Sequence, residues 1–168
     1  PVVEPAARQM KLGSNFSRPS VIEVEAAEAL LQMVGADGDM VKFAKNGSDA
    51  INAAVRLARA YTGRDHVVVC ADHPFFSTGD WFIGTTPVNA GVPEAVARLT
   101  LKFRYNDLAS LEAQFEAVGG DIAAVVLEAE TTAPPEPGFL ESVVSLCRAR
   151  GALVVLDEMI SGFRWHNG

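Results

Sequence analysis

Gly151-Ala-Leu-Val-Val-Leu-Asp157-Glu158-Met-Ile-Ser-Gly-Phe-Arg164 joins an apolar run to two carboxylates and a glycine break. The apolar run has the composition of a buried strand. Carboxylates are among the side chains least often buried without a partner, so an Asp at this position is expected to face a cation, a metal or a protonated ring. In open α/β sheets, ligands lie outside the carboxyl ends of the strands. The stretch therefore predicts a ligand-binding sheet edge at Asp157.

The composition fits one globular core with an acidic surface. Of the 168 residues, 49% are hydrophobic, and the formal net charge is -7 with a pI near 4.9. Nucleic-acid binding depends largely on cations, so this charge argues against a nucleic acid as partner. No apolar stretch is long enough to span a bilayer, and residues 1–20 lack the basic-then-apolar order of a signal peptide. We therefore expect a small-molecule partner, with no nucleic acid and no membrane.

The two cysteines, Cys70 and Cys147, both lie in apolar segments. We predict that they are small core residues, because a disulfide framework would need more cysteines. A reducing cytoplasmic compartment is the corresponding expectation.

Helical and strand-like segments alternate along the chain, which predicts an α/β fold with a mainly parallel sheet and helices on both faces. Residues 1–39 are expected to form a helical lead-in segment and residues 40–168 a partial large domain. The predicted helices are 20–34, opened by a Ser-x-x-Glu capping box, 47–63, 107–119 and a helix leading into the last strand; the predicted strands are 40–44, 67–71, 122–127 and the run ending at Asp157.

Two of these helices carry an apolar stripe that we expect to face the core. In the helix ending at Gly63, the predicted stripe consists of Ala50, Ala54, Leu57, Ala58 and Tyr61. In the last helix, it consists of Leu140, Val143, Val144 and Cys147.

The segment Lys45-Asn46-Gly47-Ser48-Asp49-Ala50 joins the predicted strand 40–44 to a helix N-terminus. Free backbone N–H groups and the helix dipole make such a place an anion site, where Gly47 admits a phosphate and Ser48 donates a hydroxyl. Simple capping of the helix by Asn46 or Ser48 is the alternative.

The irregular stretch 72–95 contains His73, Phe75 and Phe76 just after a strand. These side chains fit the flanks of a flat ring, and aromatic packing of the loop is the alternative. A metal site built from Cys70, His73 and His66 is disfavoured because a second pair of ligands is missing.

Carboxylates follow another predicted strand as well: Glu128 and Glu130 come after the apolar run 122–127, and Glu128 is the expected inward-facing group. For Asp157, a Walker-B role would need a Gly-Lys phosphate loop, and a dinucleotide fold would need Gly-x-Gly; neither pattern occurs. The remaining readings are an Asp that pairs with the protonated pyridine nitrogen of a vitamin B6 cofactor, and an Asp that caps a turn.

Taken together, several motifs in order resemble class III aminotransferases, and the branch they resemble most is the glutamate-1-semialdehyde aminomutase-like proteins. The motifs are Asn15-Phe-Ser-Arg-Pro-Ser20, Lys45-Asn-Gly-Ser-Asp-Ala50, Val55-Arg-Leu-Ala-Arg-Ala-Tyr-Thr-Gly-Arg-Asp65, Asp80-Trp-Phe-Ile-Gly-Thr-Thr86 and Leu156-Asp-Glu-Met-Ile-Ser-Gly-Phe-Arg-Trp165.

The resemblance implies fold type I architecture and a homodimer with pyridoxal 5′-phosphate (PLP) at its interface. It implies that the motif Asn46, Gly47 and Ser48 holds the cofactor phosphate and that Asp157 is the partner of the pyridine nitrogen. Met159 would lie beneath the ring, and Glu128 would be the acidic residue at the active-site end of its strand. His73 matches a residue of the ring-stacking loop. The implied substrate is an amino acid or an amino-sugar-like compound.

Two departures from the family pattern stand out. Asp72 occupies the place of the stacking aromatic, so Phe75 or Phe76 is expected to take that role. The Schiff-base lysine of the family follows the Asp-containing strand, whereas Lys11, Lys42, Lys45 and Lys102 all precede Asp157. We therefore expect a fragment of an aminotransferase or aminomutase, and the alternative is a non-catalytic module that keeps only the fold.

Overall fold

A computed structural model describes residues 2–14, 16–36, 38–72, 77–130 and 133–164, and the chain divides into two units after Lys42. The N-terminal unit contains helices α1 (Val3–Met10) and α2 (Val21–Met33). As predicted, Ser20 and Glu23 join at the start of α2: the backbone N–H and the hydroxyl of Ser20 donate to Glu23 Oε2 at 2.6 and 2.9 Å. None of the described residues of this unit is buried.

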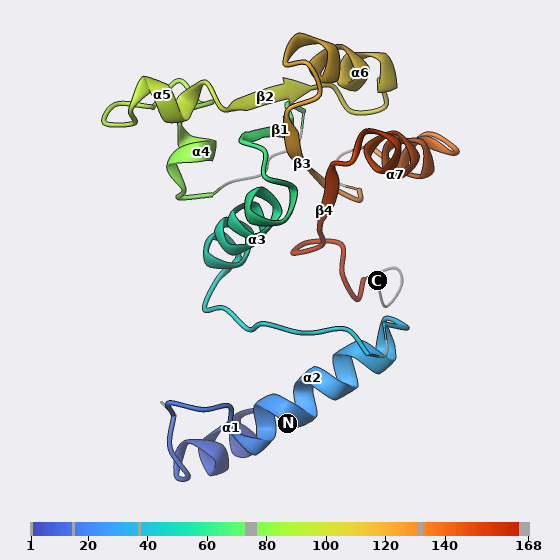
Figure 1. The fold of residues 1–168 in the computed structure, drawn as a ribbon. Coiled ribbons are helices and arrows are strands. Elements are labelled where there is room, and N and C mark those ends of the chain that lie inside the picture. The colour runs from blue at the N-terminus through green and yellow to red at the C-terminus, as the bar shows by residue number, and fades with distance from the viewer. Residues whose placement is uncertain (1, 15, 37, 73–76, 131–132, 165–168) are drawn as a thin grey trace. The chain divides into compact units, whose positions relative to one another are not determined.

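The second unit is built on a four-stranded parallel sheet with the strand order β2-β1-β3-β4 (Figure 1). The strands are β1 (His66–Cys70), β2 (Thr100–Phe103), β3 (Ile122–Glu128) and β4 (Leu153–Asp157). All seven residues of β3 are buried, which is typical of a central strand covered on both faces.

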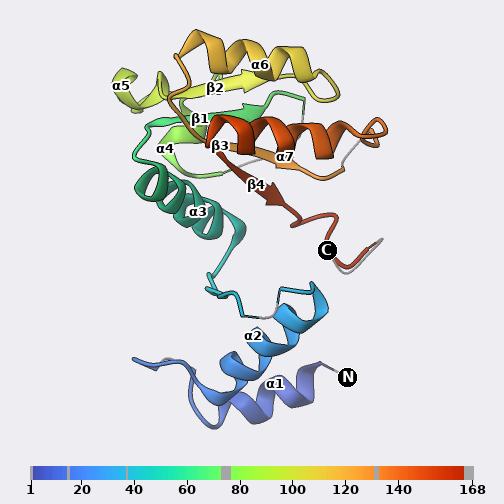
Figure 2. The same ribbon diagram turned by 45° about the vertical axis from the view of Figure 1, so that its right-hand side comes forward.

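Helices cover both faces of this sheet, as predicted (Figure 2). Helices α6 (Leu108–Ala117) and α7 (Phe139–Arg150) pack on one face, where Leu111, Phe115 and Val143 meet the strands. Helix α3 (Gly47–Thr62) and the short helix α4 (Asp80–Ile83) pack on the other. A further short helix, α5 (Glu94–Ala97), precedes β2.

Polar contacts fasten the amino edge of the sheet. Helix α3 ends at Gly63, whose left-handed φ of 67° fits the predicted C-terminal glycine. The next residue, Arg64, donates from Nη1 to the carbonyl oxygens of Ile122 at 3.1 Å and Arg150 at 2.8 Å. One guanidinium group thus joins the loop after α3 to the start of β3 and the end of α7.

Two strand predictions differ from the structure. Residues 40–44 form no strand, because β1–β4 pair only with one another and Met40 is 96% exposed. Conversely, Thr100–Phe103 is a strand that the sequence patterns did not indicate. It is a short edge strand in which only Thr100 and Phe103 are buried, so it lacks the continuous apolar run of the other strands.

The stripe predicted for α3 is wrong except at Ala58. The buried residues are Ile51, Val55 and Ala58, which follow the same helical spacing on a neighbouring face. Leu57 is 68% exposed and Tyr61 79% exposed. The branched side chains Ile51 and Val55 fill the space against β1 and β3, so the face that carries them is the one that packs.

In α7, the buried residues are Phe139, Val143 and Cys147, whereas Val144 is 40% exposed. The prediction for Cys70 and Cys147 is confirmed, since both are buried and they are not joined in a disulfide. Burial raises the pKa of the Cys147 thiol to about 12, which keeps it protonated. No helix in the described ranges is long and apolar enough to cross a membrane.

The packing of α3 predicts unequal effects for two truncations on the same helix. Ile51→Ala should lower the free energy of unfolding by about 2–5 kcal/mol, because it removes a buried branched side chain and leaves a cavity. Leu57→Ala should change it by less than about 0.5 kcal/mol, because Leu57 is exposed. Urea unfolding of both variants measures the difference. The opposite ranking would show that the stripe predicted from sequence is the packed one.

Candidate functional site

Glu128 and Asp157 end two neighbouring strands and are paired in register, Glu128 on β3 with Asp157 on β4. Two residues earlier, Val126 and Val155 pack in the cluster that contains Ile51 of α3. Because side chains alternate along a strand, Glu128 and Asp157 project from the same face of the sheet as those valines. The structure thus brings the two predicted carboxylates together on the α3 side.

The N-terminus of α3 belongs to the same edge. Helix α3 ends four residues before β1 begins, so its C-terminus lies at the amino edge of the parallel sheet and its N-terminus at the carboxyl edge. Gly47 confirms this placement: a Cβ added there would meet Met159 Cε at 2.9 Å. The absence of a side chain at Gly47 therefore lets Met159, two residues after Asp157, approach the first turn of α3.

Asn46 caps this helix, as the capping alternative predicted. Its Oδ1 accepts a hydrogen bond from Asp49 N at 2.8 Å, and its Nδ2 donates to Asp49 Oδ2 at 3.1 Å. The first N–H groups of a helix have no partner within the helix. In the described part of the chain, no recorded hydrogen bond uses the N–H of Gly47 or Ser48. Capping by Asn46 and anion binding by Gly47 and Ser48 are therefore compatible.

The two carboxylates have different environments. Glu128 is only 7% exposed, and burial raises its pKa, with the nearby charge of Asp157 as a second cause. Asp157 Oδ1 accepts a hydrogen bond from Met159 N at 2.8 Å, which fixes the carboxylate in an Asx-type turn. The hydrogen bond from Met159 N therefore orients the Asp157 carboxylate, while burial favours the protonated form of Glu128.

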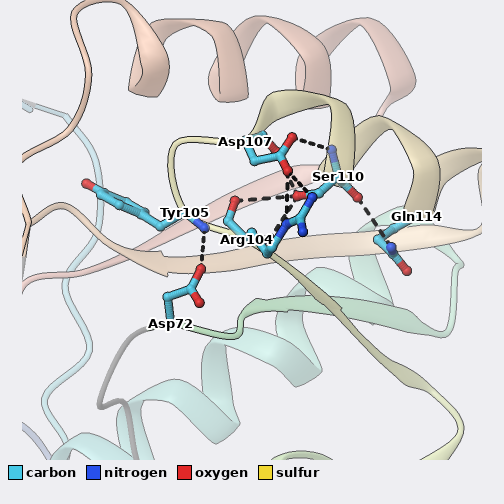
Figure 3. Close-up of polar contacts among 6 residues, drawn as sticks. All are labelled: Asp72, Arg104, Tyr105, Asp107, Ser110 and Gln114. Carbon is cyan, nitrogen blue, oxygen red and sulfur yellow. Dashed lines mark hydrogen bonds and ion pairs between the residues drawn. The ribbon is translucent and has the colours of Figure 1, made fainter.

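Loops at the carboxyl edge are tied to the turn between β2 and α6 (Figure 3). Asp72 Oδ2 accepts from the backbone N of Tyr105 at 2.7 Å, and the Tyr105 hydroxyl donates to the Ala129 carbonyl at 2.5 Å. Burial is the main cause that raises the pKa of Tyr105 to about 12, so the hydroxyl remains a donor. Asp72 thus holds this turn.

Asn106 extends the same set of contacts. It adopts a left-handed φ of 57°, its Nδ2 donates to the Pro134 carbonyl at 3.1 Å, and its Oδ1 accepts from Glu136 N at 2.9 Å. Asn106 therefore joins the turn between β2 and α6 to Pro134 and Glu136, which precede α7.

Three of the residues predicted from the sequence cannot be placed. His73, Phe75 and Phe76 lie outside the described residues. Among the described residues, no group of three or more His, Cys, Asp or Glu side chains is arranged to hold a metal ion.

The sequence patterns did not indicate Asn52, Ser77 and Thr78, which gather at the same end of α3. The available signal was Asn52 itself, a polar residue placed between the buried positions Ile51 and Val55.

Comparison with known proteins gives one consistent result. The model of the family Aminotransferase class-III matches residues 2–165. Glutamate-1-semialdehyde 2,1-aminomutase of Sorangium cellulosum is 41% identical over 181 residues, which cover 100% of this chain and 41% of that protein.

Solved structures agree. The PLP internal aldimine form of the FumI protein from Sphingopyxis sp. MTA144 superimposes with a TM-score of 0.82 at 37% identity, covering 95% of this chain and 39% of that one. A glutamate-1-semialdehyde-aminomutase from Pseudomonas aeruginosa PAO1 gives a TM-score of 0.76 at 27% identity, covering 95% and 37%. The chain spans about two fifths of the length of these relatives.

The raised pKa of Glu128 predicts a pH-dependent contribution to stability. An acid whose pKa is higher in the folded state stabilises the fold below its ordinary pKa of 4.5, and this stabilisation is lost as the pH rises through the folded value. Glu128→Gln is neutral at every pH. The unfolding free energy of this variant, relative to wild type, should therefore increase from pH 4.5 upward.

Urea titrations at a series of pH values measure this difference. Glu112→Gln is the matched control, because it removes a glutamate on the exposed side of α6. Its unfolding free energy relative to wild type should not change with pH. If the curves of wild type and Glu128→Gln run parallel with pH, the folded state does not raise the pKa of Glu128.

Proposed function

Since the chain belongs to the class-III aminotransferase family, we propose that the whole protein moves amino groups with PLP, as an aminotransferase or an aminomutase of the glutamate-1-semialdehyde branch. The observation that carries this proposal is the edge at which Asp157 and Glu128 face the open first turn of α3. The N-terminus of α3 offers a site for a phosphate group, and β4 offers the carboxylate of Asp157. A ligand that carries both a phosphate and a protonated ring nitrogen needs these two groups.

The residues present fit PLP. Gly47 has no side chain to obstruct a phosphate, its N–H and that of Ser48 are available donors, and the Ser48 hydroxyl adds a third. When bound, PLP supplies an electron sink, provided that its ring nitrogen stays protonated. Asp157 is placed to hold that proton, because one of its oxygens is already fixed by Met159 N. Met159 provides the apolar contact next to Gly47.

Glu128 has a supporting role in this scheme. A protonated Glu128 places no second negative charge beside Asp157, so the charge of Asp157 is directed at the ring nitrogen. A neutral carboxyl also has an O–H group to donate toward the substrate. His73 and Phe75 remain the proposed ring contacts in the loop after β1.

The proposed partners are an amino acid or related amino compound as substrate and a second copy of the chain. Support for the homodimer comes from the N-terminal unit, where Met10, Leu12 and Phe16 expose 72%, 73% and 50% of their surface. Large apolar side chains that gather on a surface are typical of protein–protein interaction sites. The acidic composition and the two cysteines that are not joined in a disulfide support a cytoplasmic location. A non-catalytic module is less well supported, because it would have no use for Gly47, Ser48 and Asp157 together.

A substrate assay with the full-length protein tests the reaction type. An aminomutase should convert glutamate-1-semialdehyde when this is the sole substrate, because the amino group moves within one molecule. An aminotransferase should need both an amino donor and an oxo-acid acceptor. Failure with every donor, acceptor and semialdehyde, together with failure to bind PLP, would support the non-catalytic module instead.

Substitution of the proposed ring partner gives a sharper test. Asp157→Asn in the full-length protein should lower turnover by about 100-fold or more, because an amide does not hold the ring nitrogen in its protonated form. Asp39→Asn, at an exposed position in the N-terminal unit, should leave turnover unchanged. Steady-state kinetics and the melting temperature are measured for both variants. Full activity of Asp157→Asn would remove the role assigned to Asp157.

A further inference from the structure

Asn52 lies one helical turn after Ser48, and its side-chain oxygen accepts hydrogen bonds from two donors. Trp81 Nε1 donates to Asn52 Oδ1 at 2.7 Å, and Ser77 Oγ donates to the same atom at 3.2 Å. Ser77 is fully buried, and Trp81 is 6% exposed. Ser77 Oγ in turn accepts from Gly79 N at 3.2 Å. A single amide side chain thus connects α3 to the segment 77–81.

Gly79 shows how closely this segment lies on α3. A Cβ at this position would meet Trp81 Nε1 at 2.6 Å and would also meet Asn52 Oδ1. The φ of Gly79 is -73°, which any residue can adopt, so glycine is needed here for space rather than for conformation. The segment 77–79 is therefore held against the helix with little freedom to shift.

The residue held in the middle of this segment contacts the proposed phosphate site. Thr78 N donates a hydrogen bond to Ser48 Oγ at 3.2 Å. A serine hydroxyl has one hydrogen and two lone pairs, so an Oγ that accepts from Thr78 directs its own hydrogen elsewhere. A serine hydroxyl near a helix start often donates to a carbonyl of the preceding turn. Within the described residues, the Ser48 hydroxyl donates to no such carbonyl. Its hydrogen is thus available to an anion.

We propose that Asn52 is a positioning residue for phosphate binding. By fixing Ser77 and Gly79 on α3, it places Thr78 N so that the Ser48 hydroxyl points its hydrogen toward the first turn of the helix. The ligand is a phosphate monoester dianion. This inference rests on the proposed function, in which the phosphate is that of PLP. It adds a residue that touches neither the phosphate nor the ring.

The test compares two ligands that differ only in the phosphate group. Calorimetry measures the Kd of PLP and of pyridoxal with the full-length, cofactor-free protein. Asn52→Leu should weaken PLP binding about tenfold and leave pyridoxal binding unchanged, because the loss of one oriented hydrogen bond affects only the phosphate. Equal weakening of both ligands would show that Asn52 has a merely structural role, and would overturn the inference.

A double-mutant cycle asks whether Asn52 acts through Ser48. If it does, Ser48→Ala with Asn52→Leu should bind PLP no more weakly than Ser48→Ala alone. Additive losses would overturn the inference. Gln114→Leu is the matched control, since Gln114 Nε2 makes one hydrogen bond to the Ser110 carbonyl on α6, on the opposite face of the sheet. It should change the binding of neither ligand.

Two further outcomes are misfolding of Asn52→Leu and failure of the wild-type protein to bind either ligand. If Asn52→Leu does not fold, Ser77→Ala replaces it: this variant keeps the bond between Trp81 and Asn52 and removes the two bonds of the Ser77 hydroxyl, one to Asn52 Oδ1 and one from Gly79 N. It should weaken PLP binding about threefold without affecting pyridoxal, and no selective change would overturn the inference. If wild-type protein binds neither PLP nor pyridoxal, the proposed function itself fails. If wild-type protein binds PLP tightly and Asn52→Leu weakens the binding of both ligands equally, only the inference about Asn52 fails.

Discussion

The parallel register of β3 with β4 is the constraint on which the candidate site depends. It sets Glu128 beside Asp157, and two like charges at adjacent, partly buried positions are unfavourable unless one is neutralised. The burial of Glu128 favours its neutral form, and the N-terminus of α3 on the same face supplies a favourable field for the remaining charge. Shifting β4 by one residue against β3 would turn Asp157 to the α6 and α7 face and separate it from Glu128.

Local sequence patterns predicted those parts of the fold that depend on local physics. The buried strands β1 and β3, the glycine end of α3 at Gly63 and the capping pair of Ser20 and Glu23 all follow from hydrophobic runs and from hydrogen bonds within a few residues. The location of the carboxylates at one edge also followed, because in a parallel sheet every strand ends at the same side.

What the sequence did not reveal depends on contacts between distant segments. Two adjacent stripes of α3 have helical spacing, and only the sheet decides that Ile51 and Val55 pack while Leu57 stays exposed. Asp72 appeared to be a lost aromatic, yet its carboxylate holds the backbone of Tyr105, 33 residues away. Asn52 acquires its importance from Trp81, 29 residues away. None of these pairings has a periodic signature.

The Arg64 contacts suggest how this domain can tolerate change. They lie at the amino edge of the sheet, at the end of the strands opposite to Asp157 and Glu128. The Arg64 contacts and the candidate ligand site therefore occupy opposite ends of the same strands. Substitutions at the Asp157 end can therefore change the candidate ligand site and leave the Arg64 contacts intact. Conversely, stabilising substitutions near Arg64 leave the groups of the candidate ligand site unchanged.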